Sequence, residues 1–386
     1  MRETDDVTAV VRSAAVIDLD AITHNVEVLR GCAGAAQVMA VVKADGYGHG
    51  LVPSAQAAVR GGATWLGVAF LEEALALRSA GLDVPVLAWL FSPAEDLGPA
   101  VAAGIDLGIY SAPEVARAAA AAVASGVPAR VHLKADTGLS RGGATVADWP
   151  DMCDAAAKAE ADGTIVVTGL WSHFAFADGG PDHPVNTRQA AVFAEALDLA
   201  SAKGLHPHVR HLANSAATLT APNTHYDLVR PGVSVYGLSP VPALGSPADF
   251  GLRQAMTLRS TVALTKRVPA GSGVSYLHRY TTSADTTLAL VPLGYADGIP
   301  RTATNTAEVL LRGRRRRIAG TVSMDQFVLD LGDDLVELGD DVVLFGPGLD
   351  GEPTAHEWAE ALGTIDYEIV TRVGSRVPRI YVGGQS

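Results

Sequence analysis

The chain has 386 residues, 48% of them hydrophobic, and a formal net charge of −13 at pH 7. This length predicts two domains, and the negative charge disfavours a nucleic-acid partner, whose phosphates would be repelled. No apolar stretch reaches the roughly 20 uninterrupted residues that a membrane helix needs. The polar start MRETDDVTAVVRS is unlike a signal peptide. The two cysteines, Cys32 and Cys153, fit a reducing compartment, so we expect a cytoplasmic protein.

The first two-thirds of the chain alternates short apolar runs with alanine-rich stretches such as SAPEVARAAAAAVASG. This alternation predicts successive strand–helix units. An open, doubly wound sheet could give the same rhythm, but eight units in about 225 residues favour a closed (β/α)8 barrel. The expected strands cover residues 37–43, 64–70, 84–90, 105–109, 130–136, 165–173, 209–214 and 228–236.

From about Gln254 the pattern changes to strand-like segments joined by Gly, Pro and Asp turns, followed by the helical segment PTAHEWAEALG. We therefore expect an N-terminal tail (1–12), a barrel domain (13–250) and a C-terminal, mainly β domain (251–386). The basic run RGRRRR at residues 312–317 lies between the apolar segments EVLL and IAGTV. Its position favours a solvated hairpin tip over an anion-binding patch.

The C-terminal ends of the expected barrel strands carry an unusual set of polar side chains. Reactive groups of such barrels lie at these ends. Lys43 closes an apolar strand, where a buried cation would be costly, so it is either a neutral, reactive amine or a lysine that emerges into solvent. The residues at these ends are Lys43, Lys134 with Arg141, His173, Asn214 with Ser215, and Arg230 with Gly232.

Glycine-rich turns accompany these strand ends. The loop DGYGHG after Lys43 lacks the spacing of a dinucleotide fingerprint, but its backbone amides and the Tyr47 hydroxyl could bind an anion. Turns after the seventh and eighth strands of a barrel often bind phosphate. Together with a lysine, these features indicate a cofactor that carries a phosphate and an aldehyde. His173, taken alone, fits a buried core histidine equally well.

Other chemistries receive little support from the sequence. His206, His208 and His211 are clustered, but no carboxylate or cysteine stands at metal-ligand spacing, so we expect no metal. The chain has no G-x-S-x-G motif, and neither cysteine has the surroundings of a nucleophile.

The segment AVVKADGYGHG resembles the pyridoxal-phosphate attachment site of bacterial alanine racemases, in which VKANAYGHG is typical. Further blocks similar to that family occur in the family's order and span nearly all of the chain. The family fold, a (β/α)8 barrel followed by a β domain, agrees with the strand pattern. The blocks are LKADTGLSRGG, GLWSHFAFAD, HLANSAAT, LVRPGVSVYGL, GVSYLHRY, GYADGIPR, TVSMDQF and RVPRIYVG.

The resemblance implies a racemase with two bases. Lys43 would bind pyridoxal 5′-phosphate covalently and act as the base on the D side. Tyr276 would be the base on the L side, and in this family it reaches the cofactor of the partner subunit, which implies a homodimer with shared active sites. Arg230 would contact the pyridine nitrogen, and His173 would lie between Tyr276 and Arg230.

The remaining implied roles concern the cofactor, the substrate and the entrance to the site. The expected phosphate ligands are Tyr47, Asn214, Ser215, Gly232 and Val233. Arg141 would lie near the cofactor's phenolic oxygen and the substrate, with Lys134 behind it as a candidate for carbamylation. Met324 would bind the substrate carboxylate through its backbone, and Tyr295 and Asp178 would line the entrance.

The sequence also departs from the family pattern. Ser375 stands where many relatives have a phosphate-binding tyrosine, Thr321 stands where an arginine is common at the entrance, and Asp45-Gly46 replaces Asn-Ala. Alanine racemisation, supplying D-alanine for peptidoglycan, is the expected function. A broader racemase that also accepts serine is one alternative. A non-catalytic protein that binds pyridoxal phosphate is disfavoured, because that family lacks the β domain.

Overall fold

The computed structural model describes residues 12–384, which form two compact units. One unit is Ala21–Arg253; within the described range, the other combines residues 12–20 with residues 254–384.

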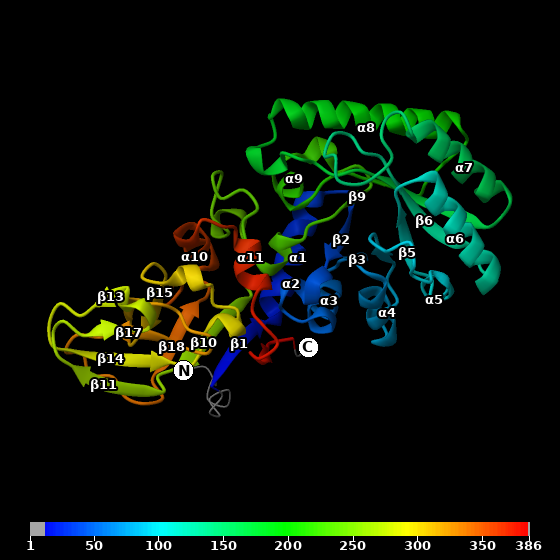
Figure 1. Cartoon of the computed structure of the whole chain (residues 1–386). Coiled ribbons are helices and arrows are strands. Elements are labelled where there is room, and N and C mark those ends of the chain that lie inside the picture. Colours follow the sequence, from blue (N-terminus) through cyan, green and yellow to red (C-terminus); the bar gives the residue numbers. More distant parts are fainter. Residues whose placement is uncertain (1–11, 385–386) are drawn as a thin grey trace. The chain divides into compact units, whose positions relative to one another are not determined.

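The first unit is built on eight parallel strands in the order β8-β7-β6-β5-β4-β3-β2-β9 (Figure 1). The two edge strands of this order approach each other, because Asp227 N donates to Arg210 O (3.1 Å) and Arg230 N donates to Ala213 O (2.9 Å). The sheet is therefore a nearly closed barrel, as predicted. Its strands are β2 (Gln37–Val41), β3 (Trp65–Val68), β4 (Val86–Ala88), β5 (Asp106–Ile109), β6 (Ala129–Lys134), β7 (Ile165–Trp171), β8 (Val209–His211) and β9 (Leu228–Val229).

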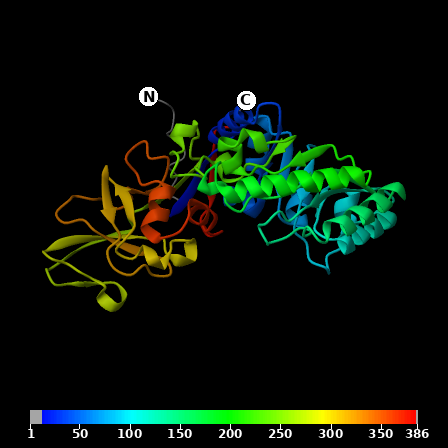
Figure 2. The same cartoon turned by 90° about the horizontal axis from the view of Figure 1, so that it is seen from above.

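Each expected barrel strand is present, although the last is much shorter than the predicted 228–236. Pro231 has no N–H to donate to a neighbouring strand, and after Gly232 the chain turns into the 3₁₀ segment η3 (Val233–Tyr236). In Figures 1 and 2 the longer helices run along the outside of the strands. The helices are α1 (Leu19–Ala33), α2 (Lys43–Tyr47), α3 (Leu51–Arg60), α4 (Leu71–Ser79), α5 (Gly98–Ala102), α6 (Ala112–Ser125), α7 (Trp149–Ala161), α8 (Pro184–Ala202) and α9 (Ser215–Thr220).

The second unit is mainly β, as predicted. Its sheets have the orders β16-β15-β18-β10-β1-β19, β11-β14-β17 and β12-β13. The predicted helix after Pro353 is α10 (Ala355–Leu362), which is followed by α11 (Asp366–Thr371). The strands are β1 (Ser13–Asp18), β10 (Met256–Thr261), β11 (Leu264–Val268), β12 (Gly273–Val274), β13 (Tyr280–Thr281), β14 (Thr286–Val291), β15 (Glu308–Leu311), β16 (Arg314–Arg317), β17 (Phe327–Asp330), β18 (Asp341–Phe345) and β19 (Arg379–Val382).

The first strand does not belong to the barrel, contrary to the expected domain range 13–250. β1 pairs antiparallel with β10, with Ala15 opposite Leu258, and parallel with β19, with Ala15 opposite Arg379. The eight later strands already close the barrel, and a closed barrel has no edge to accept another strand. Of the expected tail 1–12, residues 1–11 lie outside the described residues.

The basic run forms a hairpin, as predicted. Arg312 and Gly313 connect β15 to β16 with φ of 49° and 72°, and positive φ at both central residues is typical of two-residue hairpin turns. The arginines of β16 are paired with carboxylates: Arg314 with Asp334 (2.9 Å) and Arg315 with Glu357 (2.5 Å).

Among the described residues, no helix is long and apolar enough to cross a membrane.

Candidate active site

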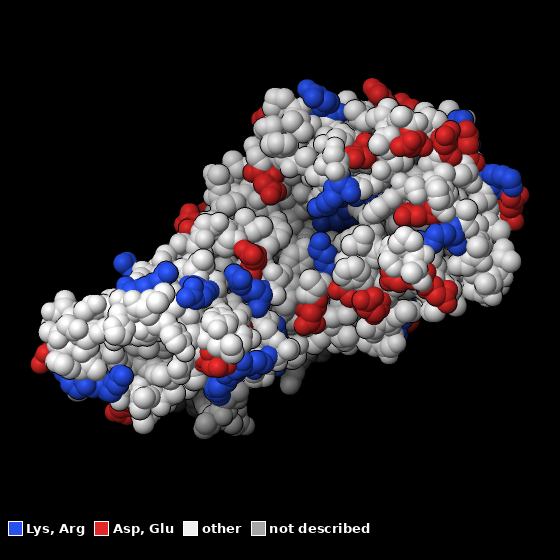
Figure 3. All heavy atoms as spheres, viewed as in Figure 1, with Lys and Arg blue, Asp and Glu red and all other residues white. Residues whose placement is uncertain are grey.

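The predicted strand-end residues do meet at one end of the barrel. Lys43 follows β2, Lys134 closes β6, His173 follows β7 and Arg230 follows β9. Because all eight strands are parallel and their sheet nearly closes, these positions surround one mouth. Figure 3 shows lysine and arginine side chains bordering a hollow in the surface of this unit. Arg141, exposed in the loop after β6, belongs to the same cluster, since its charge lowers the pKa of Lys43 and of Lys134.

The chain turns in a left-handed sense directly after Lys43. Ala44, Asp45, Gly46 and Tyr47 have φ of 54°, 53°, 61° and 53°, a conformation that costs a non-glycine residue roughly 1–2 kcal/mol. Hydrogen bonds hold the turn: Ala44 N donates to Glu73 Oε1 (2.6 Å), and Leu51 N donates to Asp45 Oδ1 (2.8 Å). Strain maintained in this way is typical of functional sites.

Lys43 is half-buried, and its ammonium lies 5.8 Å from the ring centre of Trp89. Burial and the charge of Arg141 lower the pKa of Lys43, against an opposing effect of Glu73. Burial, Arg141 and Arg230 likewise lower the pKa of the Lys134 amine to about 8. Both amines are therefore more often neutral, and more nucleophilic, than an ordinary lysine.

Tyr47, Ser215 and Gly232 form a narrow cluster beside these amines. Gly232 N donates to Ser215 Oγ (2.7 Å), and a Cβ atom on residue 232 would collide with the Tyr47 hydroxyl. Val233 follows at the start of η3. Asn214 Oδ1 accepts from Ala217 N (3.1 Å) and so caps α9. The hydroxyls of Tyr47 and Ser215 thus both approach Gly232, where there is no room for another side chain.

Arg230 is buried and tied to the barrel wall. Its Nη1 donates to His211 Nδ1 (3.0 Å), and its Nη2 donates to Ser172 O (2.7 Å) and Leu212 O (3.2 Å). Burial lowers the pKa of Arg230 to about 9, so the guanidinium stays charged at neutral pH. No hydrogen bond among the described residues uses its Nε–H.

His173 Nδ1 lies 3.3 Å from Arg230 Nη2. Burial and the charges of Arg230, Arg141, Lys134 and Lys43 hold the pKa of His173 well below its ordinary value. The imidazole is therefore neutral at pH 7. The buried Gln189 supports this loop, because its Nε2 donates to His173 O (3.0 Å). Asp178 is exposed in the 3₁₀ turn η1 (Ala177–Gly179).

The predicted site residues of the second unit share one region of that unit. Tyr276 opens η5 (Tyr276–His278) with its side chain 69% exposed. The buried Thr321 holds this turn, since its hydroxyl donates to Tyr276 O (2.8 Å). Met324 O accepts from Ala296 N (2.9 Å), beside Tyr295. Met324 and Tyr295 are both exposed.

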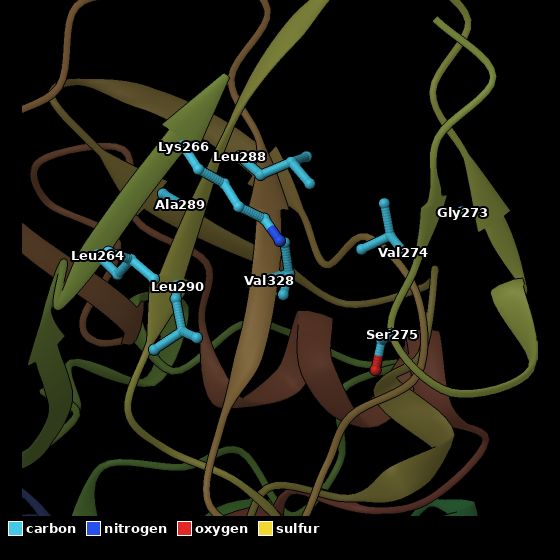
Figure 4. Close-up of a pocket in the computed structure, with 9 residues that line it drawn as sticks. All are labelled: Leu264, Lys266, Gly273, Val274, Ser275, Leu288, Ala289, Leu290 and Val328. Carbon is cyan, nitrogen blue, oxygen red and sulfur yellow. The ribbon is translucent and has the colours of Figure 1, made fainter. Parts of the chain in front are cut away.

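A cavity of about 110 Å³ lies beside the Tyr276 turn (Figure 4). Val274 and Ser275, the two residues before Tyr276, line one side, and Leu288 and Val328 face them from β14 and β17. Ser275 has φ of 61°. Ser375, which replaces the tyrosine of many relatives, is exposed near Tyr295 and Met324. Its neighbour Gly374 donates its N–H to Asp297 O (2.9 Å), and Arg376 pairs with Asp325 (2.8 Å).

Sequence reasoning missed three supporting residues: Glu73, Gln189 and His211. Glu73 lies in the first turn of α4 and accepts from Ala69 N (3.0 Å) as well as from Ala44 N. An acidic residue at a helix start could have been noticed as a cap. Gln189 and His211 gave no local signal, because their partners are distant in the sequence.

Comparison with known proteins gives consistent matches. The family model for the alanine racemase N-terminal domain matches residues 17–240, and the one for the C-terminal domain matches residues 255–381. An alanine racemase of Frankia casuarinae is 68% identical, with 96% of each chain covered. The crystal structure of the alanine racemase from Streptomyces lavendulae has a TM-score of 0.96 at 53% identity, covering 98% of both chains. That of Streptomyces coelicolor A3(2) has a TM-score of 0.95 at 56% identity, covering 98% of this chain and 100% of that one.

Proposed function

The chain belongs to the alanine racemase family, and we propose that it interconverts L-alanine and D-alanine with pyridoxal 5′-phosphate as its cofactor. The observation that carries the proposal is the half-buried Lys43, an amine of lowered pKa held at the barrel mouth by a strained turn. Such an amine suits covalent attachment to an aldehyde.

The residues around Lys43 fit this cofactor. The Tyr47–Ser215–Gly232 cluster offers hydroxyl donors where no side chain fits on residue 232, which suits a phosphate. Asn214 and Val233 extend this cluster. The free Nε–H of Arg230 suits an acceptor such as the pyridine nitrogen. When bound, the cofactor supplies an electron sink that makes the α-proton of an attached amino acid removable.

Racemisation moves a proton from one face of Cα to the other, so two bases on opposite faces are required. Lys43 takes or returns the proton on the D side, and Tyr276 does so on the L side. Both are weak bases at their ordinary pKa values, and the cations Arg141 and Arg230 tune the site. His173, neutral at pH 7, links Tyr276 to Arg230.

The other predicted residues bind the substrate or admit it. Arg141 is an exposed cation whose charge lowers the pKa of both amines, and it provides a charge for the substrate or for the cofactor's phenolic oxygen. The backbone of Met324 binds the substrate carboxylate, and Tyr295 and Asp178 border the entrance. Lys134, once carbamylated, places a negative charge beside Arg141.

The role of Lys43 is tested with the Lys43→Ala variant. We expect loss of borohydride-stable cofactor attachment, and loss of solvent deuterium incorporation at Cα of either alanine enantiomer. Lys203→Ala is the matched control, because Lys203 is a surface lysine paired with Asp154 (2.7 Å). Attachment or exchange that persists in Lys43→Ala would refute the proposal. Steady-state rates with L-alanine and L-serine in the wild type decide between a narrow and a broader racemase.

Tyr276 lies in a different unit from Lys43, and we assign it to the active site of the partner subunit in a homodimer. Lys43→Ala and Tyr276→Phe homodimers should both be nearly inactive. If sites are shared between subunits, a mixed dimer contains one intact site, built from Lys43 of one chain and Tyr276 of the other. About half of the wild-type activity per dimer is then expected. Mixed dimers without recovered activity would show that each chain builds its own site.

The physiological part of the proposal is that this cytoplasmic activity supplies D-alanine for peptidoglycan. Growth of a D-alanine auxotroph carrying the wild-type chain, and no growth with Lys43→Ala, is the expected outcome. Equal growth with both would contradict it.

A further inference from the structure

A line of buried polar side chains crosses the barrel interior beneath Arg230. His211 Nδ1 accepts from Arg230 Nη1 (3.0 Å), and His211 Nε2 lies 2.7 Å from His132 Nδ1. His132 Nε2 lies 3.0 Å from Asp106 Oδ2. Asp106 is the first residue of β5, whereas Arg230 follows the end of β9. The line therefore runs from the N-terminal end of the barrel to the mouth.

Neighbouring residues of the barrel strands pack closely against this line. Asp106, His132 and His211 are fully buried, and Arg230 is 5% exposed. A Cβ atom on Gly169, in the neighbouring strand β7, would collide with the His132 ring. Trp171 stacks on His211, with ring centres 5.6 Å apart and planes 10° apart. Buried polar groups without partners would be destabilising, and here the rings of His132 and His211 and the Asp106 carboxylate each have defined partners.

Arg230 at one end of the line and the Asp106 carboxylate at the other determine the direction of every hydrogen bond in the line. Arginine can only donate, so His211 Nδ1 must accept and His211 must carry its proton on Nε2. That proton is donated to His132 Nδ1, which leaves the His132 proton on Nε2. His132 Nε2–H then donates to the Asp106 carboxylate, which also accepts from Thr168 Oγ1 (2.8 Å) and Arg130 Nε (2.6 Å).

The protonation states agree with this direction. Burial and the charge of Arg230 hold the pKa of His211 well below its ordinary value, so this ring is neutral. Burial disfavours ionised Asp106, but the hydrogen bonds from His132 and Arg130 and the charge of Arg130 outweigh this effect and lower its pKa. An ionised carboxylate only accepts hydrogen bonds. Asp106 therefore fixes the accepting end of the line, and Arg230 fixes the donating end.

We propose that Asp106 is a remote positioning residue for Arg230: through His132 and His211 it keeps the proton off the His211 nitrogen that faces the guanidinium. This inference rests on the proposed function, because Arg230 is the predicted partner of the cofactor's pyridine nitrogen. With His211 accepting at Nη1 and backbone carbonyls accepting at Nη2, the guanidinium is held with its Nε–H free. If the hydrogen bonds of the line ran in the opposite direction, an N–H of His211 would face an N–H of Arg230.

A first experiment reads the hydrogen positions in the wild-type holoenzyme by neutron diffraction after exchange into D₂O. We expect one deuteron on Nε2 of His132, one on Nε2 of His211, and none on Nδ1 of either ring. A deuteron on His211 Nδ1, or on both nitrogens of His132, would overturn the proposal. This measurement is independent of activity, so it separates this inference from the proposed function, which fails only if the wild type does not racemise alanine.

A second experiment uses Asp106→Asn, whose amide can either accept from or donate to His132 and so removes the directional bias. We expect kcat for alanine racemisation to fall about 10-fold or more, while KM stays within about 2-fold of wild type. The absorbance of the bound cofactor should also shift. Thr168→Val is the matched control, because it removes another buried hydrogen bond to the same carboxylate without interrupting the line. We expect its kcat to stay within about 2-fold.

A double-mutant cycle shows whether Asp106 acts through His132. In a His132→Leu background, where the line is already broken, Asp106→Asn should lower kcat by less than about 2-fold. If Asp106→Asn and His132→Leu lower kcat by independent factors that multiply in the double variant, the proposal is overturned. Equal losses of kcat in Asp106→Asn and Thr168→Val would also overturn it. If Asp106→Asn does not fold, the neutron map of the wild type decides alone.

Discussion

The hydroxyl of Tyr47 occupies the space that a Cβ atom on Gly232 would need. Gly232 also donates its backbone N–H to Ser215 Oγ (2.7 Å). Tyr47 follows β2 and Gly232 follows β9, so the two residues are far apart in the sequence. They lie close together because β2 and β9 are neighbouring strands. The missing side chain therefore lets the hydroxyls of Tyr47 and Ser215 both approach Gly232, where we propose that they bind the cofactor's phosphate.

Gly232→Ala should weaken cofactor binding. The added methyl must displace the Tyr47 ring, and overpacking of this kind costs about 1–3 kcal/mol. We expect the dissociation constant of pyridoxal phosphate, measured by titrating the apoprotein, to rise about 10-fold or more. The melting temperature of the apoprotein should fall by a few degrees, because the same overpacking is present without the cofactor.

Gly31→Ala is the matched control for this substitution. Gly31 lies within α1, and its Cβ would meet nothing within 4 Å. Alanine should stabilise this helix by about 0.5–1 kcal/mol and leave cofactor affinity unchanged. Equal cofactor affinities in Gly232→Ala and Gly31→Ala would contradict the proposed phosphate site.

Lys134 should form a carbamate with carbon dioxide. Its neutral amine attacks CO₂, a C–N bond forms, and one proton is released to solvent. The product anion is stabilised by Arg141 and Arg230, the same cations that, with burial, lower the pKa of Lys134 to about 8. With ¹³C-bicarbonate we expect one protein-bound carbamate signal that grows as the pH rises through 8, because only the neutral amine reacts.

The assignment of that signal needs two variants. Lys134→Ala should abolish it, and Lys158→Ala should retain it, since Lys158 is a highly exposed lysine paired with Asp162. A signal of full intensity in Lys134→Ala would rule out carbamylation at this position.

Local patterns were sufficient to predict the barrel and the identity of the mouth residues. Strand segments alternate with helices at short range, and polar residues such as Lys43 and Arg230 interrupt apolar runs at the strand ends. Which strands pair with one another could not be predicted from local patterns. The segment SAAVID was not among the expected strands, and its placement beside β10 depends on which sheet has a free edge, which is a property of the whole fold.

Side-chain contacts between distant residues were also beyond the sequence. His211 was grouped with His206 and His208 by proximity in the chain, whereas its hydrogen-bonding partner is His132, 79 residues away. Only the barrel's curvature brings these two rings together. Thr321 could be identified as a departure from the family pattern, but its hydrogen bond to Tyr276 O requires the fold of the second unit.

Arg230→Glu should change the balance of reactions. Arginine keeps its proton, so it leaves the pyridine nitrogen unprotonated and weakens the electron sink. A carboxylic acid there can protonate that nitrogen. We expect racemisation to slow about 100-fold or more and transamination, measured as pyruvate formed from alanine, to rise. Arg188→Glu, at an exposed arginine of α8, is the charge-matched control. Wild-type partitioning between the two products in Arg230→Glu would contradict this account.

Buried neutral histidine should make stability depend on pH below neutrality. The pKa of His211 is held well below 6.5 by burial and the charge of Arg230, so below pH 6.5 the unfolded chain binds a proton that the folded chain does not. Stability therefore rises with pH towards 6.5 and is lost as the pH falls. One such proton changes the free energy of unfolding by about 1.4 kcal/mol per pH unit.

Between pH 7.5 and 5.5, His211→Asn should flatten the fall in melting temperature, measured at one scan rate. His206→Asn, at an exposed histidine, should reproduce the wild-type slope, and an unchanged slope in His211→Asn would show that His211 accepts a proton in the folded state.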